Sequence, residues 1–126
     1  MKERIDVDSR AAPLGPYSPA IRAGGLIFVS GQIPLSPDSG EVVGGSIQDQ
    51  VRQVLENTGA LLQEAGSSLD QALKCTVYLT DLGDFEAMNE VYATVFTGEA
   101  PPARTTVEVA KLPKGVGIEI DVIAEV

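Results

Sequence analysis

Apolar residues recur along this chain at two periods, and each change of period marks the edge of a predicted element. From residue 46 to residue 66 they fall three or four positions apart, which is the spacing of an amphipathic helix. Ser46 and Asp49 match a capping box at its start, and Gly66 offers a left-handed stop at its end. The predicted apolar face of this helix comprises Ile47, Val51, Val54, Leu55, Thr58, Leu61, Leu62 and Ala65.

A second stretch of helical spacing covers residues 84–96, with Asp84 as its predicted N-cap. Its methionine and aromatic stripe is of the kind that forms core packing in most amphipathic helices. The stripe and its aliphatic neighbours are Phe85, Met88, Val91, Tyr92, Val95 and Phe96.

The other apolar segments alternate with period two and predict strands. An edge strand is expected around residues 4–7, and Gly24 and Gly25 supply the hairpin turn between the next two strands. Further strands are expected in a short piece after the loop that begins at 33, at 72–80, and on both sides of the turn at 112–117. In 72–80, one predicted face carries Leu73, Cys75, Val77 and Leu79, and the other carries Lys74, Thr76, Tyr78 and Thr80. The single cysteine, Cys75, is interpreted as core packing.

The element order is roughly β-β-β-β-α-β-α-β-β, which predicts one α+β domain over residues 1–126, a mixed sheet with two helices on one face. Six strands at about 4.8 Å spacing span about 30 Å, so two helices leave the opposite face without cover. If Val107 and Val109 face the helices, that opposite face carries both charge signs and several apolar groups: Thr76, Tyr78, Arg104, Thr106, Glu108, Glu119, Asp121 and Ile123. Oligomerisation through this face explains the mixture, and a monomer with a mixed exposed face is the alternative.

The charges bear on how this face is used. An antiparallel hairpin of the last two strands would offset Arg104 from Glu119, so we expect the arginine of one copy to meet the carboxylate of another. From the pattern alone, the simpler reading of both residues is a solvated or ion-paired surface position.

The composition of the chain excludes several classes of partner and of catalytic mechanism. Eighteen acidic against nine basic residues give a net charge of −9, which argues against nucleic acid and anionic membranes as partners. The chain shows no signal peptide pattern and no apolar run long enough to span a membrane, so a soluble cytoplasmic protein is expected. It contains no histidine, which excludes Ser-His-Asp and Cys-His catalysis and imidazole zinc sites. Proton transfer then falls to Asp, Glu, Tyr, Lys, the backbone or water.

Five blocks carry a resemblance to a known family: residues 15–21 (GPYSPAI), 28–35 (FVSGQIPL), 88–96 (MNEVYATVF), 101–115 (PPARTTVEVAKLPKG) and 118–125 (IEIDVIAE). Together, in this order, they resemble the RidA-like reactive intermediate deaminases, also called the YjgF or L-PSP family. The resemblance implies a chorismate-mutase-like (YjgF-like) fold and a homotrimer with clefts between subunits. It also implies hydrolysis of 2-enamine and 2-imino acids, such as 2-aminoacrylate, to 2-keto acids and ammonia, without cofactor or metal.

By position, Arg104 resembles the arginine that binds the substrate carboxylate, and Glu119 resembles the residue that holds and activates the attacking water. A guanidinium fork matches a carboxylate, and a carboxylate is the best general base in a chain without histidine. Asp121 and Glu108 are weaker candidates and are interpreted as structural.

The remaining site residues also come from the resemblance. Tyr17 resembles the aromatic residue that closes the cleft, with loop anchoring as its alternative. Ser30 and Gly31 resemble the segment whose backbone faces the substrate, and Asn89 matches a pocket asparagine that could equally be a cap or an interface hydrogen bond. Thr106 stands where many members carry cysteine, so a thiol is not available there, while its backbone can still contact substrate.

Two other functions remain open. A trimer that binds small acids without turnover would be a regulatory sensor. An endoribonuclease or translation inhibitor, an activity also described for relatives, is disfavoured by the acidic charge and the absence of histidine.

Overall fold

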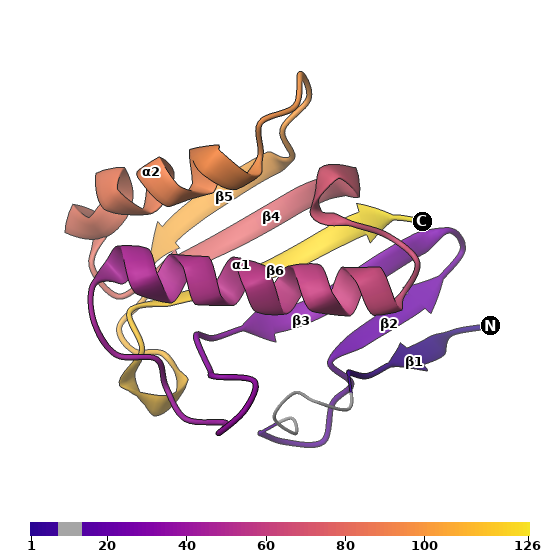
Figure 1. The fold of residues 1–126 in the computed structure, drawn as a ribbon, viewed down its shortest axis with the longest axis horizontal. Helices are drawn as coiled ribbons and strands as arrows, with labels where there is room; N and C mark the ends of the chain where they lie inside the picture. The colour runs from indigo at the N-terminus through magenta and orange to yellow at the C-terminus, as the bar shows by residue number, and fades with distance from the viewer. Residues whose placement is uncertain (8–13) are drawn as a thin grey trace.

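The computed structural model describes residues 1–7 and 14–126, which form one six-stranded sheet with two α-helices on one face (Figure 1). The strands are β1 (Glu3–Ile5), β2 (Ala20–Ala23), β3 (Leu26–Gln32), β4 (Ala72–Leu79), β5 (Ala103–Glu108) and β6 (Ile118–Glu125). The helices are α1 (Ile47–Glu64) and α2 (Phe85–Val95), with single 3₁₀ turns η1 (Leu69–Gln71), η2 (Leu82–Asp84) and η3 (Pro113–Gly115). The predicted α+β class is confirmed. Within the described residues, no helix combines the length and the apolar character that crossing a bilayer requires.

The strand order across the sheet is β1-β2-β3-β6-β4-β5. All neighbours are antiparallel except β4 and β5, which run parallel. Helix α2 joins these two strands as a crossover, and a crossover helix returns the chain in the same direction. The expected hairpin of the last two strands is therefore wrong: β6 lies between β3 and β4, and β5 is left at the edge.

The short extended piece expected after β3 does not become a strand of the sheet. Among the described residues this segment forms only an isolated bridge between Leu35 and Val42. A buried asparagine on α1 holds it in place, because Asn57 donates through Nδ2 to the Leu35 carbonyl at 2.8 Å. Asn57 was not among the predicted buried positions, and its polar contact to the loop explains why a polar residue is buried there.

Both predicted ends of α1 are confirmed. The Ser46 hydroxyl accepts from the Asp49 backbone N–H at 3.2 Å, and the Asp49 carboxylate accepts from the Ser46 N–H at 3.4 Å, which completes the capping box. Gly66 follows the helix with φ of +85°, a conformation that glycine adopts without steric cost. Helix α2 begins after Asp84 as predicted, but the Asp84 side chain makes no capping hydrogen bond.

The core lies between the helices and the sheet, and Cys75 is fully buried in it, as predicted. Leu73 is the exception to the predicted face of β4, because its side chain is 43% exposed. The pairing of β4 with β6 shifts between Ala72 and Lys74, and this irregularity takes Leu73 out of the alternation.

The capping box generates a test of stability. Replacing Ser46 with Ala removes the acceptor for the Asp49 N–H and should lower the free energy of unfolding by about 1 kcal/mol. Ser46→Asp keeps an acceptor in place and should stay close to the wild type. Urea unfolding followed by circular dichroism measures both, and equal stability of Ser46→Ala and wild type would contradict the role of the cap.

Candidate active site

The register of β5 decides which way its charged side chains point. Arg104 is paired with Cys75 and Thr106 with Val77, and both partners are fully buried beneath the helices. Paired residues of neighbouring strands point to the same face, so Arg104 and Thr106 face the helices. Their predicted placement on the opposite face is wrong.

The same correction applies to Glu108, which is paired with Leu79 on the helix side and accepts from the Leu82 N–H at 2.9 Å. The prediction fails because it places the apolar Val107 toward the core. Val107 is instead 37% exposed and paired with Tyr78 on the side away from the helices. We call that side the open face. At an edge strand, an apolar side chain alone does not identify the core.

Arg104 packs beneath α2. Its guanidinium carbon lies 4.7 Å from the centroid of the Tyr92 ring and 5.5 Å from that of Phe85, and Nη1 lies 3.8 Å from the Met88 sulfur. Two ring faces beside a guanidinium stabilise it by cation–π attraction and restrict its orientation.

Arg104 differs from the other arginines that the structure describes. Arg4, Arg22 and Arg52 each form an ion pair with a carboxylate of the chain. Within residues 1–7 and 14–126, no carboxylate pairs with Arg104. A cation that is partly buried and lacks an anionic partner is a candidate binding site for an anion.

Two buried hydroxyls lie beside this arginine. Thr106 Oγ1 has no hydrogen-bond partner among the described residues, and the Tyr92 hydroxyl has only the Cys75 thiol, a weak partner, beside it. Burial raises the pKa of the Tyr92 hydroxyl, which therefore stays protonated, and it also raises the pKa of the neighbouring Cys75 thiol. We call Arg104, Thr106 and the α2 side chains Phe85, Met88 and Tyr92 the arginine half-site.

Asn89 lies next to this half-site on α2. It follows Phe85 by four positions and Met88 by one, so it borders the stripe that supports Arg104. Its side chain is partly exposed. Its role as a pocket residue stays a prediction.

Glu119 lies on the open face, as predicted. It is paired with Tyr78 of β4, and Asp121 follows it by two residues on the same face of β6. The Tyr78 hydroxyl donates to Asp121 Oδ2 at 3.0 Å, which gives Asp121 a structural partner. Burial, and next the charge of Asp121, raise the pKa of the Glu119 carboxyl. A carboxylate with a raised pKa accepts a proton more readily than an ordinary one.

Gly31 on β3 makes room for this carboxylate. A Cβ at position 31 would meet Glu119 Oε2 at 2.3 Å, so only glycine leaves Glu119 where it lies. The adjoining Ser30 donates its hydroxyl to the Ser18 carbonyl at 2.6 Å, and its N–H donates to the Pro19 carbonyl at 2.9 Å. The hydroxyl and the backbone N–H of Ser30 thus both donate to carbonyls of the same chain.

Tyr17 precedes Ser18 in the loop before β2. Its side chain is 44% exposed, and its hydroxyl accepts from the Leu14 N–H at 3.2 Å. The phenol therefore has an anchoring contact while part of the ring remains accessible. We call Tyr17, Ser30, Gly31 and Glu119 the glutamate half-site.

The structure groups the predicted site residues into two half-sites and does not unite them. Arg104 faces the helices from β5, whereas Glu119 faces away from them on β6, and β4 lies between the two strands. The backbone of the sheet separates their side chains within one chain. The expectation that they do not pair directly in one subunit agrees with this arrangement, for a different reason than the predicted offset.

Sequence reasoning missed the aromatic support of Arg104. The pattern predicts Phe85, Met88 and Tyr92 as core, and their spacing gives no sign of a cation beside them. Met88 and Tyr92 are buried as predicted, whereas Phe85 is 38% exposed. An open groove of about 410 Å³ between α1 and α2 contains none of the predicted site residues. No group of three or more His, Cys, Asp or Glu side chains placed to hold a metal ion occurs in the described residues.

The sequence signature of the endoribonuclease L-PSP family matches residues 7–126. A RutC family protein of Pyrococcus horikoshii is 56% identical over 98% of both chains. Reactive Intermediate Deaminase A of Arabidopsis thaliana, a chloroplastic protein, is 44% identical over 98% of this chain and 65% of its own length. E. coli TdcF, whose crystal structure contains bound serine, is 40% identical in sequence. The two structures superpose with a TM-score of 0.92, and the match covers 98% of each chain.

The contact between Gly31 and Glu119 can be tested by a double-mutant cycle. Gly31→Ala forces the carboxylate aside and should cost stability in the wild-type background, because a Cβ and Oε2 cannot occupy the same space. In a Glu119→Ala background the same change should cost about 1 kcal/mol less, since the clash is gone. Chemical unfolding of the four proteins measures this coupling, and additive costs would show that Gly31 and Glu119 do not touch.

Proposed function

The chain belongs to the endoribonuclease L-PSP family, the YjgF or Rid family, and on that premise we propose that it hydrolyses 2-enamine and 2-imino acids. Its products are 2-keto acids and ammonia, and the substrates include 2-iminobutanoate and 2-iminopropanoate, the imine form of 2-aminoacrylate. The reaction proceeds without a cofactor in clefts between the subunits of a homotrimer. The name of the Arabidopsis thaliana relative supports the deaminase class.

One observation carries the proposal: Arg104 has no carboxylate partner among the described residues, although the chain holds twice as many acidic as basic residues. In such a chain a solvated arginine meets a carboxylate readily, and Arg104 meets aromatic rings and a sulfur instead. The missing anion is the carboxylate of the substrate. Serine, which the E. coli relative binds in its crystal structure, also carries a carboxylate.

Arg104 holds the substrate by two parallel hydrogen bonds from its guanidinium fork to the carboxylate. Thr106 lies two residues further along the same face of β5, and its buried hydroxyl, which has no partner among the described residues, supplies a further polar group beside the fork. Phe85 and Tyr92 keep the fork in one orientation, which lowers the entropy lost on binding.

Glu119 of a second subunit supplies the base. It takes a proton from a water molecule while the water oxygen bonds to the imine carbon, and it returns that proton to the nitrogen, which gives a neutral carbinolamine. Glu119 then takes the proton of the carbinolamine hydroxyl as the C=O bond of the keto acid forms, and passes it to the nitrogen as the C–N bond breaks with its electron pair on nitrogen. Ammonia leaves, Glu119 returns to its starting state, and no oxidant or reductant is needed.

The open face is the surface that joins the subunits. Phe28 on β3 is 43% exposed and paired with Ile123 on β6, and the exposed Leu73 and Val107 flank the same face. A sheet face with apolar side chains and half-buried carboxylates is unfavourable in water and suits a partner surface. Because β5 is the edge strand of the sheet, a trimer contact that extends around this edge brings the arginine half-site of one copy to the glutamate half-site of the next.

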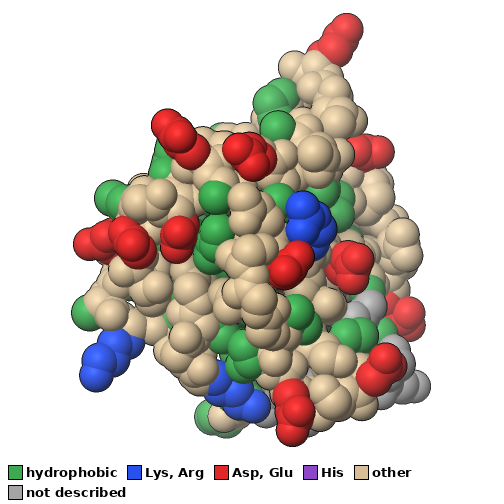
Figure 2. Space-filling view, turned by 60° about the vertical axis from the view of Figure 1, so that its left-hand side comes forward, with side chains coloured by type: hydrophobic (Ala, Val, Ile, Leu, Met, Phe, Trp, Pro, Cys, Tyr) green, Lys and Arg blue, Asp and Glu red, His purple; other side chains and the backbone are tan. Residues whose placement is uncertain are grey.

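Two other functions compete. A regulatory trimer would bind 2-keto acids in the same cleft without repeated turnover. An endoribonuclease would need a basic surface for the phosphate backbone, and Figure 2 shows acidic side chains scattered over the face in view with few basic ones among them. The net charge of −9 points the same way.

The proposal predicts that Arg104→Lys loses most activity, because an ammonium group cannot replace the planar fork. Charge-assisted bonds of about 1.5–3 kcal/mol correspond to a loss of about 10- to 150-fold in kcat/KM. Keto-acid release from imines made in situ by an amino-acid oxidase measures it, with Arg52→Lys as the matched control on α1. Near-normal turnover of Arg104→Lys would refute the carboxylate role.

If each active site takes residues from two subunits, two inactive variants should restore activity when they are mixed in one oligomer. Arg104→Lys and Glu119→Gln proteins should each be nearly inactive, and subunits of the two mixed equally by joint refolding should regain about one quarter of the wild-type sites. Each recovered site takes its arginine from one variant and its glutamate from the other. If mixed oligomers form and stay inactive, both groups act within one chain, and the intersubunit cleft is wrong.

A further inference from the structure

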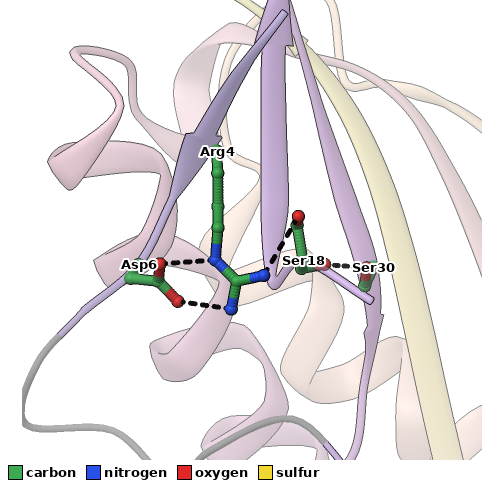
Figure 3. A network of polar contacts seen from close by, with 4 residues as sticks. All are labelled: Arg4, Asp6, Ser18 and Ser30. Carbon is green, nitrogen blue, oxygen red and sulfur yellow. Dashed lines mark hydrogen bonds and ion pairs between the residues drawn. The ribbon is translucent and has the colours of Figure 1, made fainter. Parts of the chain in front are cut away.

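A polar network ties the N-terminal strand to the loop before β2 and to β3 (Figure 3). Arg4 holds Asp6 with two donors, Nε to Oδ2 at 2.7 Å and Nη2 to Oδ1 at 3.2 Å. Its third donor, Nη1, reaches the Ser18 hydroxyl at 3.3 Å. The Ser18 carbonyl accepts in turn from the Ser30 hydroxyl at 2.6 Å. One residue of the loop is thus held from two sides, by an arginine and by β3.

This network lies on the same sheet face as Glu119. Arg4 is paired with Ile21, Ile21 with Phe28, and Phe28 with Ile123, which alternates with the buried Val122. The strand neighbour of Arg4, Ile5, is buried on the helix side. Arg4 and Glu119 therefore share the open face, although they stand on strands at different places in the sheet order.

We propose that Arg4 is a positioning residue of the glutamate half-site, which it orders through Ser18. The proposal rests on the proposed function. Ser18 adjoins Tyr17 on one side, and its carbonyl holds Ser30, the neighbour of Gly31, on the other. By fixing Ser18, Arg4 sets the distance between the aromatic side chain that closes the cleft and the strand that accommodates Glu119.

The contribution is local and has little effect on overall stability. The side chains of Arg4 and Asp6 are 50% and 46% exposed, and ion pairs at such exposure contribute little to the free energy of unfolding. The two hydrogen bonds from Arg4 to the Asp6 carboxylate do, however, restrict the guanidinium to one orientation. In that orientation Nη1 points to the Ser18 hydroxyl. Loss of Arg4 should loosen the loop while the fold persists.

The local readout is amide hydrogen exchange by NMR. The Ser30 N–H, bonded to the Pro19 carbonyl, and the Tyr17 N–H, bonded to the Gly15 carbonyl, should exchange about fivefold faster in Arg4→Ala than in the wild type. Amides of α1 should not change. The matched control is Arg52→Ala, which removes an exposed Arg–Asp pair on α1 that has no contact with this loop.

The functional readout separates binding from chemistry. Arg4→Ala should raise KM for the imino acid by about 3- to 10-fold with kcat changed by less than about twofold, because the residue orders the cleft and does not touch the reacting atoms. Ser18→Ala removes the acceptor of the third bond and should reproduce this effect. Combining the two changes should add little, since both remove the same contact.

Several results would overturn the positioning role. These are unchanged exchange at Ser30 and Tyr17, faster exchange throughout α1, unchanged KM despite a looser loop, or additive effects of Arg4→Ala and Ser18→Ala. If the wild type neither hydrolyses imines nor binds a 2-keto acid in an NMR titration, the proposed function is wrong. The exchange comparison would then still decide whether Arg4 orders the loop.

Discussion

The pairing of β5 with β4 is the constraint on which the rest of this structure depends. Because α2 returns the chain parallel to β4, the register places Arg104 beside Cys75, under the helix. Strand β6 fills the position between β3 and β4 and presents Glu119 to the other side. Side chains on opposite faces of one sheet cannot meet, and so the cation and the carboxylate belong to different surfaces of the subunit. Under the proposed function, each surface therefore needs a second copy of the chain to complete the site.

Much of the fold was predictable because the signals were local. Ser46, Asp49 and Gly66 interact with backbone only a few residues away, so the ends of α1 could be identified from the sequence. Alternation likewise showed which residues of a strand share a face. Which face meets the helices depends on pairing between distant segments, and Val107 shows that apolar character does not decide it. Leu73 was misplaced because the irregular pairing near it has no local sequence signal.

The site was predictable to a different extent. The family resemblance identified which residues are candidates for the site. The structure adds what each of these residues contacts. Arg104 is supported by Tyr92, which lies in the core, and by Phe85, which is 38% exposed. Ser30 was expected near the substrate, and both its hydroxyl and its backbone N–H are already bonded within the chain, to Ser18 and Pro19. The same side chains pack within the fold and contact the candidate site residues, which is why the pattern alone could not separate the two roles.

The unpartnered hydroxyl of Thr106 has a consequence for the heat resistance of the chain. A buried hydroxyl without a partner costs about 1–3 kcal/mol, and an apolar residue of similar shape at position 106 would avoid that cost. Such a replacement would raise the melting temperature. Under the proposed function it would also remove a group that receives the substrate, so durability and readiness for a guest oppose each other at this position.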